Sequence, residues 1–373
     1  MEKRLTVGLT FQPITCYSFT VKSLEVAMKV LLIGGTGIIS SAISRRAIEL
    51  GWELWHLNRG SRPPQSWGAP EGSGVFRQIN QDISMEAETA KKLSGMEFDA
   101  VADFISFVPE HVERNYRLFN GKTRQYIFIS SASAYQKPLA YNNCITESTP
   151  LSNPFWEYSR NKIACENFLM EKYRKEDFPV TIVRPSHTYD EWKVPVGVHG
   201  KKGSWQVVKR IIDGKPVIIH GDGTNLWTLT SSEDFAKGFT GLVANIHAIG
   251  EAVHITSDET LSWNQIHRII ADALGKPLNA VHVSSEFLAK AAPEYGYSGS
   301  LLGDKAATAI FDNSKIKRLV PDFCANIRAD QGIRKVLENL LAHPELQEED
   351  PEFDGFCDKV IVAQKTALDL FGN

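Results

Sequence analysis

Tyr158 and Lys162 are the residues whose types and spacing most directly indicate chemistry. The segment 156–174 around them has a helical pattern, and residues four apart lie on one face of a helix. The Lys162 ammonium can therefore lie beside the Tyr158 phenol and favour its ionised form. Such a phenol can exchange a proton with a substrate hydroxyl near neutral pH, so the pair predicts a general acid/base.

Upstream of this pair, Ser131 is a candidate for holding the reacting oxygen. The apolar run 126–129 predicts a buried strand, and the chain continues as Ser-Ser-Ala-Ser-Ala-Tyr over 130–135. Open α/β sheets bind their ligands at the carboxyl ends of the strands, where this segment delivers its hydroxyl groups. We expect the Ser131 hydroxyl to hydrogen-bond the oxygen atom that reacts.

The elements that must position these side chains begin with a glycine turn. Residues 34–37, Gly-Gly-Thr-Gly, follow the apolar run 30–33 and precede a helical segment. The glycines permit a sharp turn that brings backbone N–H groups to phosphate oxygens, and the helix N-terminus adds partial positive charge. Ser40 replaces the usual third glycine, and its small side chain still permits close helix–strand packing. The expected dinucleotide contacts are Gly34, Thr36, Gly37, Ile38 and Ile39.

Each signal has a structural explanation when taken alone, because tight turns, serine-rich strand ends and Tyr-x-x-x-Lys spacings all occur by chance. Together and in this order they favour an enzyme ancestry. The chain resembles the extended short-chain dehydrogenase/reductase family, which includes NAD-dependent epimerases and dehydratases acting on sugars. The resemblance covers about 28–338, and in this family a serine lies four residues before a tyrosine, as Ser131 does before Tyr135.

The resemblance implies a catalytic set of Ser131, Tyr158 and Lys162. Tyr158 would be the general acid/base during hydride transfer, while Lys162 would lower its pKa and bind the nicotinamide ribose. Ser131 would polarise the carbonyl or hydroxyl of the substrate. Sugar 4,6-dehydratases of the family carry an Asp-Glu pair after the serine, because eliminating water needs a further acid and base. This chain has Ala132 and Ser133 there, so we expect oxidoreduction, or epimerisation through a transient keto intermediate.

The order of the predicted elements indicates an α/β fold, a Rossmann-like doubly wound parallel sheet with a smaller C-terminal substrate-binding portion. We expect 28–189 to form the NAD(P)-binding Rossmann domain. Residues 190–373 would form mainly the substrate-binding portion, with some segments returning to the sheet. Residues 1–27 are expected to be a dispensable extension or the result of an upstream start, because Met28 opens the first strand directly. Strands are expected at 29–34, 53–58, 75–79, 99–104, 125–130 and 180–184, and helices near 38–50, 85–94, 109–119, 156–174, 204–213, 232–246, 262–274 and 329–342.

The end of the second strand distinguishes between the two nicotinamide cofactors. Asn58 stands where an NAD-binding chain has a carboxylate for the adenosine ribose, and Arg59 and Arg62 follow. An arginine attracts a 2′-phosphate, which a carboxylate repels. We therefore favour NADP, with NAD held by Asn58 as the alternative. Asp82 and Ile83 resemble the family's adenine-contacting pair, although an aspartate there can also cap the following helix.

Two further segments resemble the substrate side of the family. Residues 184–189 resemble its Arg-Pro-x-x-x-Tyr segment, in which Pro185 lies beside the nicotinamide and His187 is a candidate substrate contact or an incidental loop histidine. Within 221–236, Trp227 stands where nucleotide-sugar members usually carry an arginine for the diphosphate. An indole cannot neutralise a diphosphate but can stack on a sugar ring. We expect an unphosphorylated sugar or sugar-like polyol, with a packed core aromatic as the alternative interpretation of Trp227.

Composition limits the classes of function. The chain has 373 residues, 43% of them hydrophobic, which suffices for two cores. A net charge of −3 gives no general attraction to nucleic acid or anionic membranes, and no apolar stretch approaches the length of a bilayer span. Five scattered cysteines without C-x-x-C spacing predict neither a disulfide framework nor a metal site. We expect a cytoplasmic enzyme with a small-molecule substrate, and an acidic cluster at 345–352 that is a solvated surface.

A non-catalytic alternative comes from a second, looser resemblance. The tripeptide Asn58-Arg59-Gly60 is similar to the chloroplast stem-loop RNA-binding relatives of the family. The complete set of candidate catalytic residues favours the enzyme, and the acidic charge balance without a basic stripe makes nucleic acid an unfavourable partner. The family resemblance also implies a homodimer formed through helices of the nucleotide-binding domain.

Overall fold

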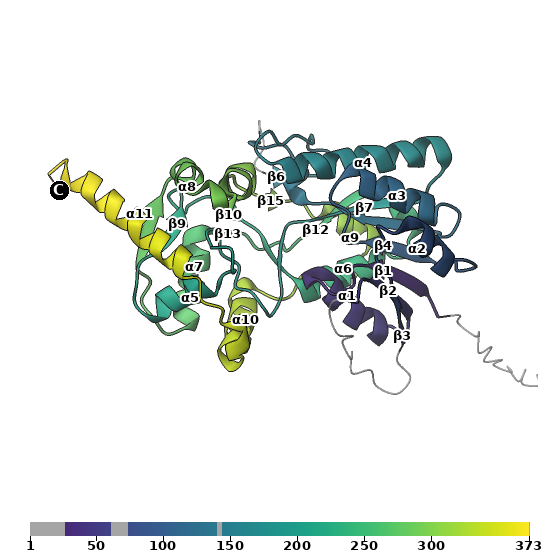
Figure 1. Cartoon of the computed structure of the whole chain (residues 1–373), viewed down its shortest axis with the longest axis horizontal. Helices are drawn as coiled ribbons and strands as arrows, with labels where there is room; N and C mark the ends of the chain where they lie inside the picture. Colours follow the sequence, from purple (N-terminus) through teal and green to yellow (C-terminus); the bar gives the residue numbers. More distant parts are fainter. Residues whose placement is uncertain (1–26, 61–73, 140–143, 373) are drawn as a thin grey trace, which may run out of the picture.

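The computed structural model describes residues 27–60, 74–139 and 144–372 (Figure 1). The predictions made for residues 1–26 and for Arg62 lie outside these described residues.

A seven-stranded sheet forms the centre of the amino-terminal half, with the strand order β12-β7-β5-β4-β1-β2-β3 and parallel pairing throughout. Its central strands are continuous apolar runs, as expected for strands that are covered on both faces. The doubly wound α/β fold predicted from the sequence is confirmed. The strands of this sheet are β1 (Lys29–Ile33), β2 (Glu53–Asn58), β3 (Val75–Asn80), β4 (Ala100–Asp103), β5 (Tyr126–Ile129), β7 (Val180–Pro185) and β12 (Ala252–Ile255).

Helices cover both faces of this sheet (Figure 1). On one face, α1 (Ile38–Glu49) and α6 (Ser232–Leu242) pack side by side and share an apolar cluster that includes Ile43 and Phe239. On the other face, α2 (Glu86–Lys92), α3 (Pro109–Phe119) and α4 (Glu157–Glu176) lie over a second cluster that includes Val112 and Leu169. Because β12 and α6 lie late in the chain, the carboxyl-terminal half also contributes to the sheet and to the helices that cover it.

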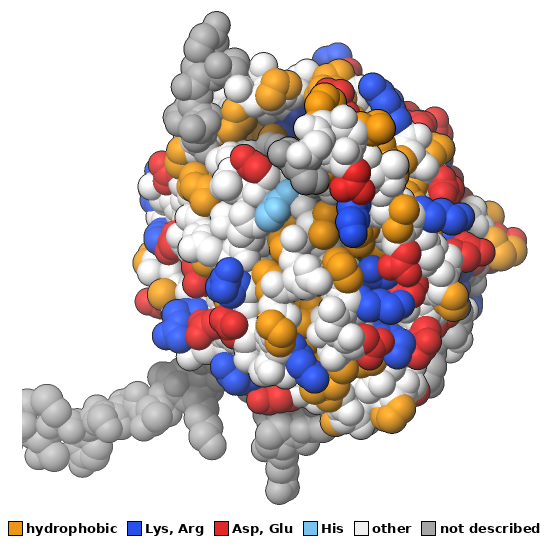
Figure 2. All heavy atoms as spheres, turned by 90° about the vertical axis from the view of Figure 1, so that its left-hand side faces the viewer, with side chains coloured by type: hydrophobic (Ala, Val, Ile, Leu, Met, Phe, Trp, Pro, Cys, Tyr) orange, Lys and Arg blue, Asp and Glu red, His pale blue; other side chains and the backbone are white. Residues whose placement is uncertain are grey.

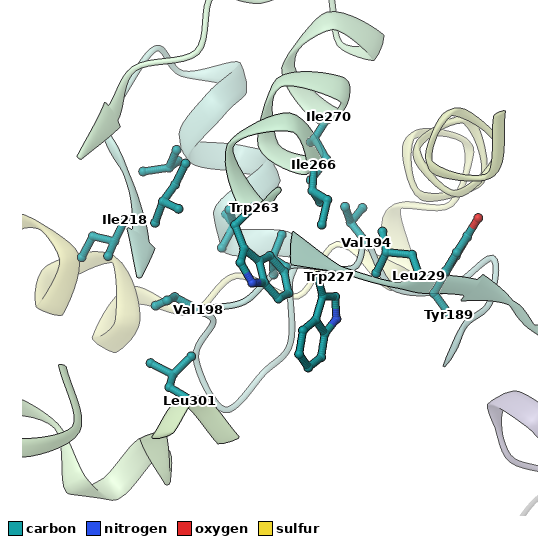
Figure 3. Packing of buried hydrophobic residues seen from close by; sticks show 14 of the residues in the cluster. Tyr189, Val194, Val198, Ile218, Trp227, Leu229, Trp263, Ile266, Ile270 and Leu301 are labelled. Atoms are coloured by element: carbon teal, nitrogen blue, oxygen red, sulfur yellow. The ribbon is translucent and has the colours of Figure 1, made fainter. Parts of the chain in front are cut away.

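The rest of the carboxyl-terminal half surrounds a third apolar cluster, in which the indoles of Trp227 and Trp263 lie 5.4 Å apart between ring centres (Figure 3). Its helices are α5 (Trp205–Ile212), α7 (Trp263–Ala273), α8 (Ser285–Ala291), α10 (Ala329–Ala342) and α11 (Pro351–Asp369), and a π-helix, η4, spans Ser298–Lys305. The short helix α9 (Ser314–Leu319) packs instead against α6 and β12, on the apolar cluster that α1 and α6 share. Short strand pairs join loops around it: β6 (Cys144–Ile145), β8 (His187–Tyr189), β9 (Val217–His220), β10 (Leu226–Trp227), β11 (Leu229–Ser231), β13 (Leu261–Ser262), β14 (Ala280–Val283) and β15 (Ile310–Phe311).

The acidic cluster at 345–352 is exposed at its four glutamates, as expected, and departs from a solvated surface only at Asp350. Asp350 is 4% exposed, and its carboxylate accepts a hydrogen bond of 3.1 Å from the backbone N–H of Phe353. This side chain caps the first turn of α11, a use of aspartate that its charge alone does not predict. Across the described ranges, none of the helices combines the length and apolarity needed to cross a membrane.

Candidate active site

The glycine turn between β1 and α1 is shaped by close packing. Gly34 has φ +86°, and a Cβ there would lie 2.3 Å from Cγ2 of Ile105. A Cβ on Gly35 would lie 2.4 Å from the His56 ring. The Ser40 hydroxyl donates to the Gly34 carbonyl at 2.8 Å and accepts from the Gly37 N–H at 2.8 Å. Ser40 therefore does more than fit beside the strand, because it ties the two ends of the turn together.

A cavity of about 810 Å³, here called the cofactor cleft, lies along the carboxyl ends of the central strands. It brings together the described residues that the sequence predicts to contact a dinucleotide. These are Gly34, Thr36, Gly37, Ile38, Ile39, Asn58, Arg59, Asp82, Ile83 and Pro185. The cleft also reaches Tyr158 and Lys162 on α4, and it includes His111 and Arg114 of α3, which the sequence analysis did not identify.

The hydrogen bonds of the Asn58 side chain indicate whether the cleft suits a dinucleotide. Its Oδ1 accepts a 3.1 Å hydrogen bond from the Gly35 N–H, which joins the end of β2 to the glycine turn. Its Nδ2 is buried and has no partner among the described residues. A buried amide donor without an acceptor is costly, and a ribose oxygen would supply one. Together with a turn in which two glycines leave no room for a Cβ, this unpaired donor fits a nicotinamide dinucleotide.

Asp82 lines the same cleft and already has hydrogen-bond partners. Its carboxylate accepts from the backbone N–H of Ser84 at 2.9 Å and from the Ser84 hydroxyl at 2.8 Å. These bonds hold the pKa of Asp82 below its usual value, and the charge of Arg59 acts in the same direction. The carboxylate thus shapes the turn before α2 while remaining at the wall of the cleft.

The loop after β5 brings Ser131 close to Tyr158, which lies in the first turn of α4. Ser131 caps a short 3₁₀ turn over Ala132–Ala134, and its hydroxyl lies 2.8 Å from the Ser133 hydroxyl. Ser159, next to Tyr158 on α4, donates to the same Ser133 hydroxyl at 2.7 Å. Burial raises the pKa of Tyr158, and a hydrogen bond with Ser131 partly offsets that rise. The net direction differs from the expected lowering, because withdrawing the phenol from water opposes its ionisation.

Lys162 lies below the phenol, one helical turn further along α4. Its Nζ is 5.8 Å from the Tyr158 ring centre and donates to the backbone carbonyls of Ser106 at 2.6 Å and Ile129 at 2.7 Å. Burial lowers the pKa of Lys162 to about 8. The ammonium is therefore still mostly charged at neutral pH and is held at a fixed place on the wall of the cofactor cleft.

A second cavity of about 240 Å³, here called the inner pocket, lies beyond the cofactor cleft. Tyr158 and Pro185 line both cavities, so the phenol stands at their junction. The other walls of the inner pocket are Ser131, Ala132, Ser133, Lys137, Trp156, Ser186, His187, Thr188, Trp227, Asp304, Lys305, Ala309 and Phe311. A ligand in the inner pocket would thus lie between Ser131 and the predicted substrate contacts His187 and Trp227.

His187 and Trp227 form a pair. The indole N–H of Trp227 donates to Nδ1 of His187 at 3.1 Å, and Trp227 is 2% exposed. Burial lowers the pKa of His187 to about 3. Because an indole nitrogen can only donate, Nδ1 must be the acceptor and the ring proton is on Nε2. Trp227 is packed beside Trp263, as the core-aromatic interpretation expects (Figure 3). It also lines the inner pocket, and its contact with a substrate stays a prediction.

Three charged residues of the inner pocket were missed by sequence reasoning: Lys137, Asp304 and Lys305. Lys137 follows the serine-rich strand end, which gives a weak signal of its position. Asp304 and Lys305 end the π-helix η4, and nothing in the surrounding sequence predicts that conformation. π-Helices are rare and occur frequently at functional sites.

Comparisons with known proteins show what this chain is similar to. The sequence model described as "NAD dependent epimerase/dehydratase family" matches residues 30–255. The chain is 24% identical over 299 residues to 2′-dehydrokanamycin reductase of Streptomyces kanamyceticus, covering 80% of this chain and 81% of that protein. It is also 24% identical over 257 residues to the chloroplast stem-loop binding protein of 41 kDa b of Arabidopsis thaliana, covering 67% of this chain and 64% of that protein.

Solved structures show the same fold. Pal from Bacillus thuringiensis has a TM-score of 0.65 and 20% identity, covering 84% of this chain and 99% of Pal. UDP-glucuronic acid 4-epimerase from Bacillus cereus, in complex with NAD, has a TM-score of 0.63 and 16% identity, covering 86% of this chain and 100% of the epimerase.

Proposed function

Because the chain belongs to the NAD dependent epimerase/dehydratase family, we propose that it is an NAD(P)-dependent oxidoreductase or epimerase acting on a sugar or sugar-like polyol. One observation carries the proposal. Tyr158 lines both the cofactor cleft and the inner pocket, with Ser131 on the inner pocket and Lys162 on the cleft. This is the arrangement that a proton transfer coupled to hydride transfer requires.

The cofactor would be held by residues of the cleft. The N-terminus of α1, which the glycine turn at Gly34–Gly37 lets a ligand approach closely, suits the pyrophosphate. The N–H groups of Gly34, Gly35 and Gly37 already bond within the protein. The unpaired Nδ2 of Asn58 suits an oxygen of the adenosine ribose, and Lys162 suits the nicotinamide ribose. When bound, the nicotinamide supplies the hydride donor or acceptor.

The chain's own residues would handle the proton and the substrate oxygen. Ser131 Oγ would hydrogen-bond that oxygen. In the reductive direction the Tyr158 hydroxyl would donate its proton to the oxygen, and in the oxidative direction the Tyr158 phenolate would accept the proton of the substrate hydroxyl. The raised pKa of the buried phenol keeps it protonated at neutral pH. The free enzyme is therefore prepared to donate a proton, which favours the reduction of a carbonyl as the first step to assay.

We further propose NADP as the preferred cofactor. Asn58 puts no carboxylate at the ribose position, and Arg59 lies on the cleft wall close enough to Asp82 to influence its pKa. Titration of the protein with NADPH and with NADH, followed by cofactor fluorescence, tests this preference. A dissociation constant for NADPH at least about tenfold below that for NADH supports it, and equal constants contradict it.

The reaction is tested by following the absorbance of reduced nicotinamide with a panel of keto-sugars, sugars and sugar acids. Tyr158→Phe is the matched control, because it removes only the phenolic oxygen. It should lower kcat by about 10²-fold or more while leaving cofactor affinity unchanged. Stereochemical analysis of the product separates an epimerase from a net oxidoreductase. A variant as active as the parent chain would refute the role of Tyr158.

The RNA-binding alternative receives less support from the surface. Figure 2 shows Lys and Arg side chains interspersed with Asp and Glu on the face that it presents, rather than gathered into a stripe. Non-specific RNA binding depends on clustered cations that neutralise phosphates. A salt-sensitive RNA mobility shift, without turnover of any sugar, would reverse the ranking. The homodimer implied by the resemblance stays a prediction, testable by light scattering.

A further inference from the structure

The inner pocket contains more positive charge than its own residues neutralise. Lys137 is 3% exposed, and its Nζ lies 4.0 Å from Asp304 Oδ1, its sole ion-pair partner among the described residues. Lys305 has no ion pair in the described part of the chain, and its Nζ makes one long contact of 3.4 Å with the Ser300 carbonyl. The described walls of the inner pocket therefore hold two lysine side chains and one carboxylate.

The position of Lys305 is fixed by its backbone. Its carbonyl oxygen lies within hydrogen-bonding distance of three donors: His220 Nε2 at 3.0 Å, Asn225 Nδ2 at 2.8 Å and Trp263 Nε1 at 3.1 Å. These contacts hold the end of η4 against the third apolar cluster. The side chain of Lys305 is close enough to His187 for its charge to help lower the pKa of that histidine, after burial as the main cause.

The same π-helix is tied to the candidate catalytic residues. Gly299 and Gly303 pack against Trp156, where an added Cβ would lie 2.3 Å from the indole Cδ1 and 2.9 Å from the Trp156 Cβ, respectively. Asn153 Nδ2 donates to the carbonyls of both Ser133 and Gly303, at 2.8 Å and 2.7 Å. The loop that carries Ser131 and the helix that delivers Asp304 and Lys305 are thus joined through one side chain and one aromatic ring.

Buried ammonium groups are costly unless an anion pairs with them. Burial lowers the pKa of both Lys137 and Lys305, which is the direction expected when the compensating charge is insufficient. Asp304 offsets at most one of the two. The remaining charge faces a pocket whose described walls hold no other carboxylate.

We propose that Lys137 and Lys305 form an oxyanion subsite, so that the substrate is a sugar or polyol bearing one anionic group, a carboxylate or a phosphate monoester. This deepens the proposed function and rests on it for the rest of the substrate. The cavity of about 240 Å³ suits one sugar unit. A nucleotide diphosphate is disfavoured, since Trp227 is packed into the wall at the position where an arginine would hold it.

The test measures binding without turnover, by calorimetry on the full chain. The probes are glucuronate, glucose 6-phosphate and, as the neutral analogue, methyl glucoside. The subsite predicts that at least one anionic probe binds about tenfold or more tightly than methyl glucoside. Preference for glucuronate assigns a carboxylate, and preference for glucose 6-phosphate assigns a phosphate. Equal affinity for all three, or binding of the neutral probe alone, overturns the proposal, and this comparison needs no variant.

Substitutions of the two lysines then test whether they bind the anionic group. Lys137→Met and Lys305→Met should each weaken the preferred anionic probe about tenfold or more while leaving the affinity for methyl glucoside unchanged. Lys365→Met, at an exposed position on α11, is the matched control and should change neither. Unchanged anion affinity in both pocket variants contradicts the assignment. Turnover confined to neutral sugars would refute the subsite and leave the proposed function standing. Anion binding without any turnover would support the subsite and contradict the proposed function.

Discussion

Two glycine substitutions test separately whether the turn needs its glycines in order to fold and whether it binds phosphate. Gly34→Ala places a Cβ 2.3 Å from Ile105 Cγ2 and forces a residue with a side chain to φ +86°. Gly37→Ala meets nothing closer than the Ser40 hydroxyl at 3.4 Å, and its backbone is extended, at φ −90° and ψ 178°. The first change should damage the fold, and the second should damage cofactor binding.

The magnitudes follow from these contacts. A left-handed residue with a Cβ costs about 1–2 kcal/mol and overpacking costs about 1–3 kcal/mol, so Gly34→Ala should lose roughly 2–5 kcal/mol of stability. Gly37→Ala should lose less than about 1 kcal/mol, because the position tolerates alanine conformationally. If the Gly37 methyl keeps a phosphate oxygen from the turn, one charge-assisted hydrogen bond is lost, and NADPH should bind about 10–100-fold more weakly.

The assay combines urea unfolding, followed by tryptophan fluorescence, with NADPH titration of each variant. Gly37→Ala should unfold near the midpoint of the parent chain and bind NADPH weakly. If it binds NADPH as tightly as the parent, the turn is not the pyrophosphate site and the cofactor assignment fails. If Gly34→Ala unfolds at the parent midpoint, the packing argument for the turn is wrong.

Three further predictions concern stability and the inner pocket. Ser40→Gly restores the glycine usual at that position, yet it should lower the unfolding free energy by about 1–2 kcal/mol, because it removes the hydroxyl that bonds both Gly34 and Gly37; an unchanged urea midpoint would contradict this. Burial lowers the pKa of three histidines to about 4, namely His56, His220 and His267. Since the unfolded chain binds protons below about pH 6.5 that the folded chain does not, stability should fall as the pH drops from about 6.5 towards 4, and a urea midpoint that is flat across this window would refute it. Trp227→Phe removes the donor to His187 Nδ1 and part of a packed ring, so it should cost about 1–3 kcal/mol and raise KM for the substrate, as measured by unfolding and steady-state kinetics; a loss of stability without any change in KM would mean that Trp227 is structural alone.

The sequence determined the parts of this protein that depend on neighbouring residues. Apolar runs marked the strands β1, β4 and β5, because strands covered on both faces need no polar alternation. The glycine turn and the Tyr158–Lys162 spacing could also be identified from the sequence, because each lies within one element or at one junction between elements. The doubly wound fold and the family were confirmed, while the roles of the individual site residues stay predictions.

Tertiary structure alone decided which distant residues share the inner pocket. Lys137 follows β5, whereas Asp304 and Lys305 end a π-helix far along the chain, and no local pattern relates them. The place of β12 at the sheet edge and the burial of Asp350 likewise depend on how separate elements pack. The direction of the Tyr158 pKa also depends on tertiary structure. The spacing on the helix places Lys162 near the phenol, but the pKa is raised because the assembled pocket withdraws the phenol from water.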